Sequence, residues 1–143
     1  MKLTVVSYVK NRNRDLQAAE EEYLKRLKRY AKTEIREIRQ WDEDTGLPAA
    51  LLKGTRRVGL FVDGKTYGSE ELAKTLQQRL NQGHSHLVLL IGGPEGMPAA
   101  AAAQTHERWS LSKLTFSHQL ARLLLLEALY RSFDLLHGGR YHK

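Results

Sequence analysis

The segment from residue 57 to residue 93 most constrains the fold, because it holds two apolar runs on either side of a helix-like pattern. The runs are RVGLFVD (57–63) and HLVLLIGG (86–93), which are apolar at almost every position. Parallel strands covered on both faces have this pattern, whereas a strand with one wet face alternates. Between them, SEELAKTLQQRLNQG (69–83) begins with acidic residues and ends in glycine, which predicts a helix capped by Ser69. The segment therefore predicts a strand–helix–strand unit.

The same alternation continues along the rest of the chain. Further strands are predicted at LTVVSYV (3–9), at TEIREI (33–38) and at the start of RWSLSKLTF (108–116). Helices are predicted at 15–32, 97–107 and 117–136, with a weaker one at 42–52. Strands that alternate with helices predict one α/β domain over residues 1–143, with a mainly parallel sheet and helices on both faces. We expect Asp15 to cap the helix at 15–32.

The charge of the chain indicates a polyanionic partner. Its 143 residues include 23 Lys and Arg against 16 Asp and Glu, a formal net charge of +7. Nucleic acid is the first candidate, and a charge that serves only solubility is the alternative. Basic residues gather in the second half of the helix expected at 15–32, where the predicted RNA contacts are Lys25, Arg26, Lys28 and Arg29.

What the sequence lacks disfavours several classes of protein. Without cysteine, the chain has no disulfide, no thiolate metal ligand and no cysteine nucleophile, which is compatible with the cytoplasm. No run approaches the roughly 20 apolar residues of a membrane span, and the first residues do not resemble a signal peptide. His84 and His86 have no third ligand at a suitable spacing. We therefore expect a cytoplasmic protein with neither a membrane segment nor a metal site.

The stretch LLIGGPEG (89–96) ends a strand in a loop with few side chains. Ligands of open α/β sheets bind beyond the carboxyl ends of the strands, and glycine lets a backbone approach a ligand closely. The alternative is a tight turn that needs a positive φ. Phosphate-binding motifs are absent, and the carboxylate of Glu95 favours a neutral or cationic ligand. The loops LFVDGK (60–65) and SLSKLTFSHQ (110–119) are expected at the same edge, so three loops are predicted to form one pocket.

Several stretches together closely resemble the bacterial ribosomal RNA large subunit methyltransferase H family. They are LLIGGPEG, WSLSKLTFSHQLARLLLLEALYRSF (109–133), the terminal GGRYHK (138–143) and EEEYLKRLKRY (20–30). The likeness covers nearly the whole chain and is weakest over 33–53. It implies the SPOUT class of methyltransferases, with a C-terminal trefoil knot that is an exception to the rule against threaded connections. It also implies a homodimer that transfers a methyl group from S-adenosylmethionine to N3 of a pseudouridine in 23S ribosomal RNA of the assembled ribosome.

The resemblance further implies which residues hold the methyl donor. In this class the donor lies bent in the knot, held largely by backbone groups of three loops. Carried over position by position, the contacts fall at Leu60, Gly93, Leu111, Ser112, Lys113, Leu114, Thr115 and Phe116. This chain has Ser117 where many members have proline, and a serine at this position is expected to cap the last helix.

The terminal motif holds the expected catalytic residues, Tyr141 and His142. His142 is the candidate base for the N3 proton, because histidine is the usual side chain for proton transfer near neutral pH, whereas a disordered tail is the alternative. Tyr141 is expected to stack on the target base or to form a hydrogen bond with it. Arg140 and Lys143 are expected to hold phosphate or to stabilise an anion. Two glycines before them would let the tail fold over a pocket, that of its own subunit or of a partner.

The helix expected at 117–136 is apolar around most of its girth, which indicates a core position or a dimer interface. Within it, Arg122 is expected to reach RNA or the dimer partner, or else to form an ordinary salt bridge. His118 is interpreted as a structural residue or a pocket wall. Two other functions remain open from the residues alone: a basic RNA-binding module without catalysis, and an enzyme that acts on a small metabolite through the same glycine loop.

Overall fold

The computed structural model describes residues 1–11 and 13–142, and its centre is a five-stranded sheet. The strands are β1 (Lys2–Tyr8), β2 (Lys32–Ile38), β3 (Arg56–Thr66), β4 (His86–Gly92) and β5 (Glu107–Ser110). They are arranged in the order β2-β1-β4-β3-β5, and every neighbouring pair is parallel. The α/β fold with a parallel sheet is therefore confirmed.

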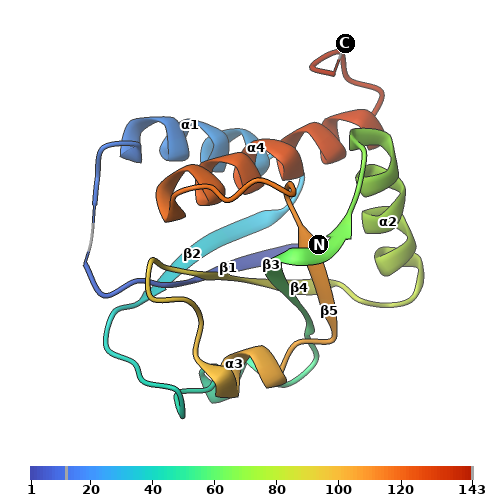
Figure 1. The fold of residues 1–143 in the computed structure, drawn as a ribbon. Coiled ribbons are helices and arrows are strands. Elements are labelled where there is room, and N and C mark those ends of the chain that lie inside the picture. Colours follow the sequence, from blue (N-terminus) through green and yellow to red (C-terminus); the bar gives the residue numbers. More distant parts are fainter. Residues whose placement is uncertain (12, 143) are drawn as a thin grey trace.

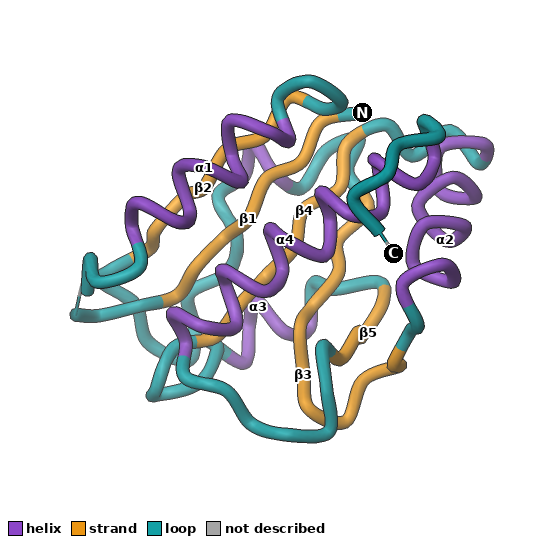
Figure 2. Tube along the Cα trace, turned by 90° about the horizontal axis from the view of Figure 1, so that it is seen from above, coloured by secondary structure: helices purple, strands orange, loops and turns teal. Residues whose placement is uncertain are grey.

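Helices cover both faces of this sheet, as predicted (Figure 1). On one face lie α1 (Gln17–Leu27), α2 (Ser69–Asn81) and α4 (His118–Leu136), which stand in front of the strands in Figure 2. The other face carries the short α3 (Ala99–Ala103) and a single 3-10 turn, η1 (Ala49–Leu51).

The apolar run of β4 is continuous because its side chains enter two separate cores. Leu87 and Leu89 pack into the cluster beneath α4, which includes Leu125. Val88 and Leu90 point the opposite way and join a second cluster with residues of η1 and α3. Successive side chains of a strand alternate between the two faces of the sheet, so a strand that is covered on both faces needs apolar residues throughout.

The helix predicted at 42–52 is wrong except for its last turn. The structure forms only η1 there, and Pro48 before it has an extended backbone with ψ 138°. Proline disfavours the helical region for the residue before it, and Gly46 adds the entropic cost of ordering a glycine. These two residues outweigh the weak helical pattern of the segment.

Two of the three expected helix caps are also wrong. The N-cap of α1 is Leu16 rather than Asp15. Ser69 is the first residue of α2, and the Gly68 backbone N–H before it donates to the Glu71 carboxylate at 3.0 Å. Ser117 is confirmed as the N-cap of α4, because its Oγ accepts a hydrogen bond from the Leu120 backbone N–H at 3.4 Å.

Candidate functional site

Three segments that are distant in sequence line one cavity of about 300 Å³ at the carboxyl end of β4. They are residues 60–62 in the middle of β3, just beyond its last pairing with β4 at Gly59, the glycine stretch after β4, and the segment between β5 and α4. The lining includes every donor contact carried over from the resemblance except Lys113, namely Leu60, Gly93, Leu111, Ser112, Leu114, Thr115 and Phe116. The prediction that these three stretches form a single pocket is thus confirmed, whereas the loop expected at 60–65 is wrong, because β3 continues to Thr66. Lys113 is exposed.

The glycine stretch is a tight hairpin. Gly93 and Gly96 exchange two backbone hydrogen bonds, of 3.0 and 2.8 Å, so that Pro94 and Glu95 form the exposed tip. Gly96 has a φ of +90°, which favours glycine. A Cβ on Gly93 would lie 2.5 Å from the Tyr8 carbonyl oxygen of β1. The turn therefore requires Gly96 for its positive φ. Gly93 is required because a side chain there would collide with the backbone of β1.

The segment between β5 and α4 shapes the opposite wall. The Ser110 hydroxyl donates to the Ser112 carbonyl at 2.7 Å, and the Leu114 N–H donates to Ser112 Oγ at 3.0 Å. At the mouth of the pocket, Leu114 is 69% exposed and Val62 is 53% exposed. Uncovered apolar side chains beside a cavity are typical of a surface that a ligand or a partner covers.

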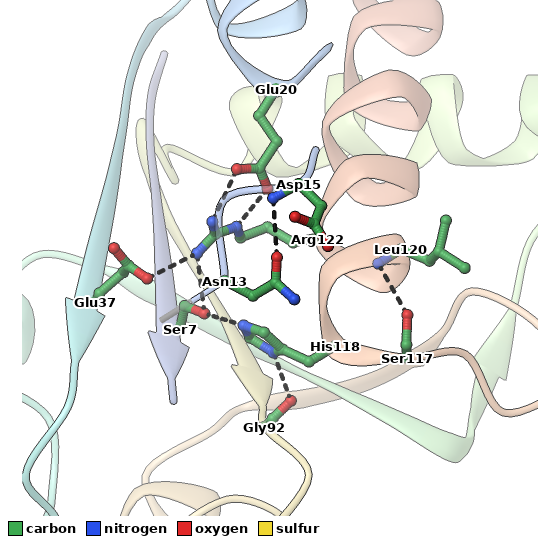
Figure 3. Close-up of polar contacts among 10 residues, drawn as sticks. All are labelled: Ser7, Asn13, Asp15, Glu20, Glu37, Gly92, Ser117, His118, Leu120 and Arg122. Carbon is green, nitrogen blue, oxygen red and sulfur yellow. Dashed lines mark hydrogen bonds and ion pairs between the residues drawn. The ribbon is translucent and has the colours of Figure 1, made fainter. Parts of the chain in front are cut away.

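Arg122 lies in a buried ion-pair cluster close to the same edge (Figure 3). Its guanidinium contacts Glu20 through two nitrogens, one of them Nη2 at 2.8 Å from Oε1, and approaches Glu37 at 3.4 Å. Burial lowers the pKa of Arg122, but the nearby carboxylates, Glu20 first, raise it by more, so the pKa of Arg122 lies above its ordinary value. Of the alternatives weighed for Arg122, the salt bridge is the one that the structure forms.

His118 connects this cluster to the pocket. Its Nδ1 lies 3.1 Å from the carbonyl oxygen of Gly92, and its Nε2 lies 2.8 Å from Ser7 Oγ, which Arg122 also approaches. A carbonyl oxygen only accepts hydrogen bonds, so Nδ1 must carry a proton. His118 thus anchors the strand end that begins the glycine hairpin (Figure 3), which agrees with its interpretation as a structural residue.

Ser7, Glu20 and Glu37 were not predicted from the sequence as partners of these residues. A signal for Glu20 was present, since it follows Leu16 by four residues and precedes Leu27 by seven on the buried stripe of α1. Ser7 is likewise a hydroxyl inside an apolar strand. A polar residue on a buried face needs a partner, but the partner itself lies too far away in sequence to be identified.

The terminal residues pack against α1 and α4 rather than into the pocket of their own chain. The Tyr141 hydroxyl lies 2.8 Å from that of Tyr23 and donates to Glu127 at 3.1 Å, while its backbone N–H donates to Asp134 at 2.9 Å. Burial, then the Tyr23 hydrogen bond and the Glu127 carboxylate, raise the pKa of Tyr141. Among the described residues, neither Tyr141 nor His142 lines the pocket. Arg140 is exposed, and Lys143 lies outside the described residues.

The basic set on α1 lies at the other end of the sheet from the pocket. Lys25, Lys28 and Arg29 are exposed, where the chain leaves α1 to begin β2. Arg26 pairs with Glu22 at 3.0 Å and lies over the ring of Tyr23, 5.2 Å from its centroid. The structure therefore separates these predicted RNA contacts from the pocket within one chain.

Over residues 1–11 and 13–142, no group of three or more His, Cys, Asp or Glu side chains is arranged to hold a metal ion. Within the same residues, no helix is long and apolar enough to cross a membrane.

An open parallel sheet with an apolar, glycine-walled pocket at its carboxyl edge is the arrangement typical of α/β proteins that bind small molecules. The family model described as "Predicted SPOUT methyltransferase" matches residues 1–142. The chain is 38% identical over 143 residues to ribosomal RNA large subunit methyltransferase H of Sorangium cellulosum, with 99% of each chain covered. It is 36% identical over 159 aligned residues to the protein of that name from Acetivibrio thermocellus, with 100% of each covered.

This chain therefore belongs to the SPOUT methyltransferase family, among the relatives named ribosomal RNA large subunit methyltransferase H. Its fold is also similar to a solved structure titled as a probable methylase family protein from Haemophilus influenzae. That match has a TM-score of 0.63 at 10% identity and covers 99% of this chain and 70% of the other. At this identity the match supports the fold alone.

Proposed function

We propose that this protein transfers a methyl group from S-adenosylmethionine to N3 of a pseudouridine in 23S ribosomal RNA of the assembled ribosome, in the cytoplasm. The observation that carries the proposal is the single pocket of about 300 Å³ formed by three segments that are distant in sequence. Ribosomal RNA is proposed as the substrate because the relatives that align over the whole chain are named ribosomal RNA large subunit methyltransferase H. The net charge of +7 suits a polyanionic substrate.

The chemistry of the pocket fits the proposed methyl donor. Its volume lies at the lower end of the range for small-molecule sites, about 300–1,000 Å³. Leu60, Leu111 and Phe116 supply apolar walls for an adenine ring, and the glycine hairpin supplies backbone. None of its described lining residues is lysine or arginine, so no cationic side chain of the lining opposes a sulfonium.

In this reaction the donor would supply an electrophilic methyl group. The sulfur of the donor would keep the electron pair of the broken carbon–sulfur bond. The residues of this chain position that methyl group and manage the proton of the acceptor. His142 takes the proton from N3, which leaves the nitrogen its electron pair for the new bond to carbon. Tyr141 stacks on the base, and Arg140 and Lys143 stabilise the anion or a phosphate.

The position of the tail favours a homodimer with a shared site. In one chain, Tyr141 is held by residues 127–134 of α4, whereas the pocket is bordered by residue 121 and the loop before α4. We therefore propose that the tail which completes each pocket comes from the second copy. Leu120 and Leu124 of α4, 45% and 37% exposed, supply an apolar surface for this contact. The C-terminal trefoil knot belongs to the same proposal.

Filling the pocket tests the proposal directly. Ala121 borders the pocket from α4, and Ala121→Leu should weaken S-adenosylmethionine binding at least tenfold, measured by calorimetry. The matched control is Ala18→Leu, because Ala18 is an exposed alanine on α1. Methyl transfer is then followed by mass spectrometry of 23S RNA after incubation with ribosomes. Equal binding in both variants, or no transfer by the unmodified protein, would contradict the proposal.

The alternative is a basic RNA-binding module without catalysis. Its charge would suffice for RNA, but this alternative gives no reason for a pocket whose apolar and backbone walls come from three separate segments. A protein that binds ribosomes but shows no S-adenosylmethionine binding in the micromolar range would favour the module.

A further inference from the structure

A second hollow lies on the other side of the glycine hairpin. This cavity of about 120 Å³ is bordered by Asn11 and Asn13 after β1, by Pro94 at the hairpin tip, and by Gln119 and Arg122 on α4. Figure 3 shows Asn13, His118 and Arg122 around this region. The hairpin thus separates two cavities, one apolar and one lined by polar side chains.

The topology of the sheet places this hollow where a ligand is expected. After β1 the chain moves outward to β2, whereas after β4 it crosses to β5 on the opposite side of the sheet. The loops that follow the adjacent strands β1 and β4 therefore diverge. In open α/β sheets, such a switch point creates a crevice at the carboxyl ends of the strands, and ligands bind in it.

The lining of the hollow suits a nucleobase. The side-chain amides of Asn11 and Gln119 each carry donors and an acceptor, the groups that pair with a Watson–Crick edge. Asn13 adds its amide N–H donors, while its Oδ1 already accepts a hydrogen bond from the Asp15 N–H at 2.8 Å. Pro94 adds an apolar wall, and Arg122 is fixed in place by Glu20 and Glu37. The volume equals about four waters of liquid, which suits a single planar ring rather than a helix of RNA.

Exposed cations surround the same edge. Lys10 and Arg39 border a shallow hollow with Glu37, and Arg14 borders a further one that also includes Glu37. Lys10 Nζ lies 4.5 Å from the ring centroid of Trp41. The acidic groups on this side include Asp15 and Glu21, both exposed. Cations beside a base-sized hollow suit a nucleotide whose base lies inside and whose phosphates lie outside.

We propose that this hollow binds one unpaired nucleotide of the RNA substrate, adjacent in sequence to the nucleotide that is methylated. Lys10, Arg14 and Arg39 contact its phosphates. The backbone of the hairpin stands between the hollow and the donor pocket, so the base held here anchors the strand and does not itself receive the methyl group. This inference rests on the proposed function, because it takes RNA as the substrate.

Two double variants test the two halves of the interaction. Asn11→Ala with Gln119→Ala should raise KM for ribosomes at least tenfold, with kcat and the Kd for S-adenosylmethionine unchanged. Lys10→Glu with Arg39→Glu should weaken binding to ribosomes and reduce the salt slope of binding by about 0.7 for each phosphate that the protein no longer neutralises. The control is Lys53→Glu with Lys74→Glu, an equal change in charge at exposed sites elsewhere.

The outcomes separate this inference from the proposed function. Both are supported when the first two variants lose ribosome affinity and the control keeps it. The inference is overturned when the Lys10 and Arg39 variant behaves like the control, or when the Asn11 and Gln119 variant keeps the KM of the unmodified protein. Failure of the unmodified protein to bind S-adenosylmethionine would instead overturn the proposed function. The ribosome affinities of the Lys10 and Arg39 variant and of its control would still show whether the hollow contacts RNA.

Discussion

Two ion-pair clusters at opposite ends of the sheet have mirrored compositions. At the amino end, Glu107 of β5 accepts hydrogen bonds from Arg79 at 2.7 Å and from Arg56 at 2.8 Å. At the carboxyl end, Arg122 of α4 contacts Glu20 and Glu37. One cluster centres on an acid between two arginines, and the other centres on an arginine between two acids.

The difference lies in what else each cluster contacts. The Glu107 carboxylate also accepts a hydrogen bond from the Trp109 indole at 3.1 Å, so this cluster joins β3, α2 and β5 as scaffold. Arg122 instead approaches Ser7, which contacts His118, which in turn contacts Gly92 at the pocket. Similar interactions should therefore have different consequences: disruption of the first should change stability alone, and disruption of the second should also change the pocket.

The largest expected effect is that of Arg122→Met. This variant leaves the Glu20 carboxylate buried without its partner, and breaking a buried pair in this way costs about 3–5 kcal/mol of unfolding free energy. Urea denaturation at pH 7 measures the loss, and calorimetry should show weaker S-adenosylmethionine binding. Replacing both partners, Glu20→Leu with Arg122→Met, should recover most of the stability. A single variant that loses less than about 1 kcal/mol would contradict the assignment of a buried pair.

The second effect concerns Glu107→Gln. Burial alone would raise the pKa of Glu107, but hydrogen bonds from Arg79, Arg56 and Trp109 lower it from 4.5 to about 2. A depressed pKa means that the ionised carboxylate stabilises the folded state above pH 4.5, and this stability is lost as the pH falls from 4.5 to 2. The contribution at neutral pH is about 3 kcal/mol.

The variant Glu107→Gln should lose most of that stability at pH 7 and show a flatter decline in acid. Acid titration of the unfolding free energy compares it with the unmodified protein. Its affinity for S-adenosylmethionine should stay unchanged, because the cluster lies away from the pocket. An equal loss of affinity in the Glu107 and Arg122 variants would remove the distinction between the two clusters.

The sequence predicted the strands and α4 because long apolar runs depend on burial over many residues, and burial is what holds the sheet together. The place of the pocket was predictable for a related reason, since the carboxyl ends of parallel strands meet at one edge of the sheet. That its wall at residues 60–62 belongs to β3 rather than to a loop was not. The ends of helices were harder. Whether Asp15 or Leu16 caps α1 depends on the path of the preceding loop, where Asn13 accepts a hydrogen bond from the Asp15 N–H instead.

Partnerships across the fold could not be predicted from one sequence. Arg122 pairs with Glu20 over a separation of 102 residues and with Glu37 over 85. No periodicity or motif relates positions so far apart. The reason for Gly93 was equally out of reach, because the backbone that excludes its Cβ belongs to Tyr8 of a neighbouring strand. Sequence patterns indicate which residues are buried, but the pairing of buried polar groups depends on tertiary structure.

The smallest expected effect on stability, and the sharpest test of the comparison, is His118→Ala. Loss of its two hydrogen bonds should cost about 1–2 kcal/mol of unfolding free energy. That is less than the expected loss in Glu107→Gln, yet donor binding should weaken by about three- to tenfold, because the carbonyl of Gly92 loses its anchor beside the pocket. Glu107→Gln should thus lose more stability in denaturation than His118→Ala, whereas His118→Ala should lose more affinity for S-adenosylmethionine in calorimetry.

Two conservative variants separate the hydrogen bonds of His118. Asparagine places its amide nitrogen near the position of Nδ1 and can still donate to Gly92, whereas glutamine reaches the position of Nε2 near Ser7. If the Gly92 contact positions the hairpin, His118→Asn should keep the donor affinity of the unmodified protein and His118→Gln should not. The opposite order would place the important contact at Ser7, and would mean that His118 acts on the pocket through β1 rather than through the Gly92 carbonyl.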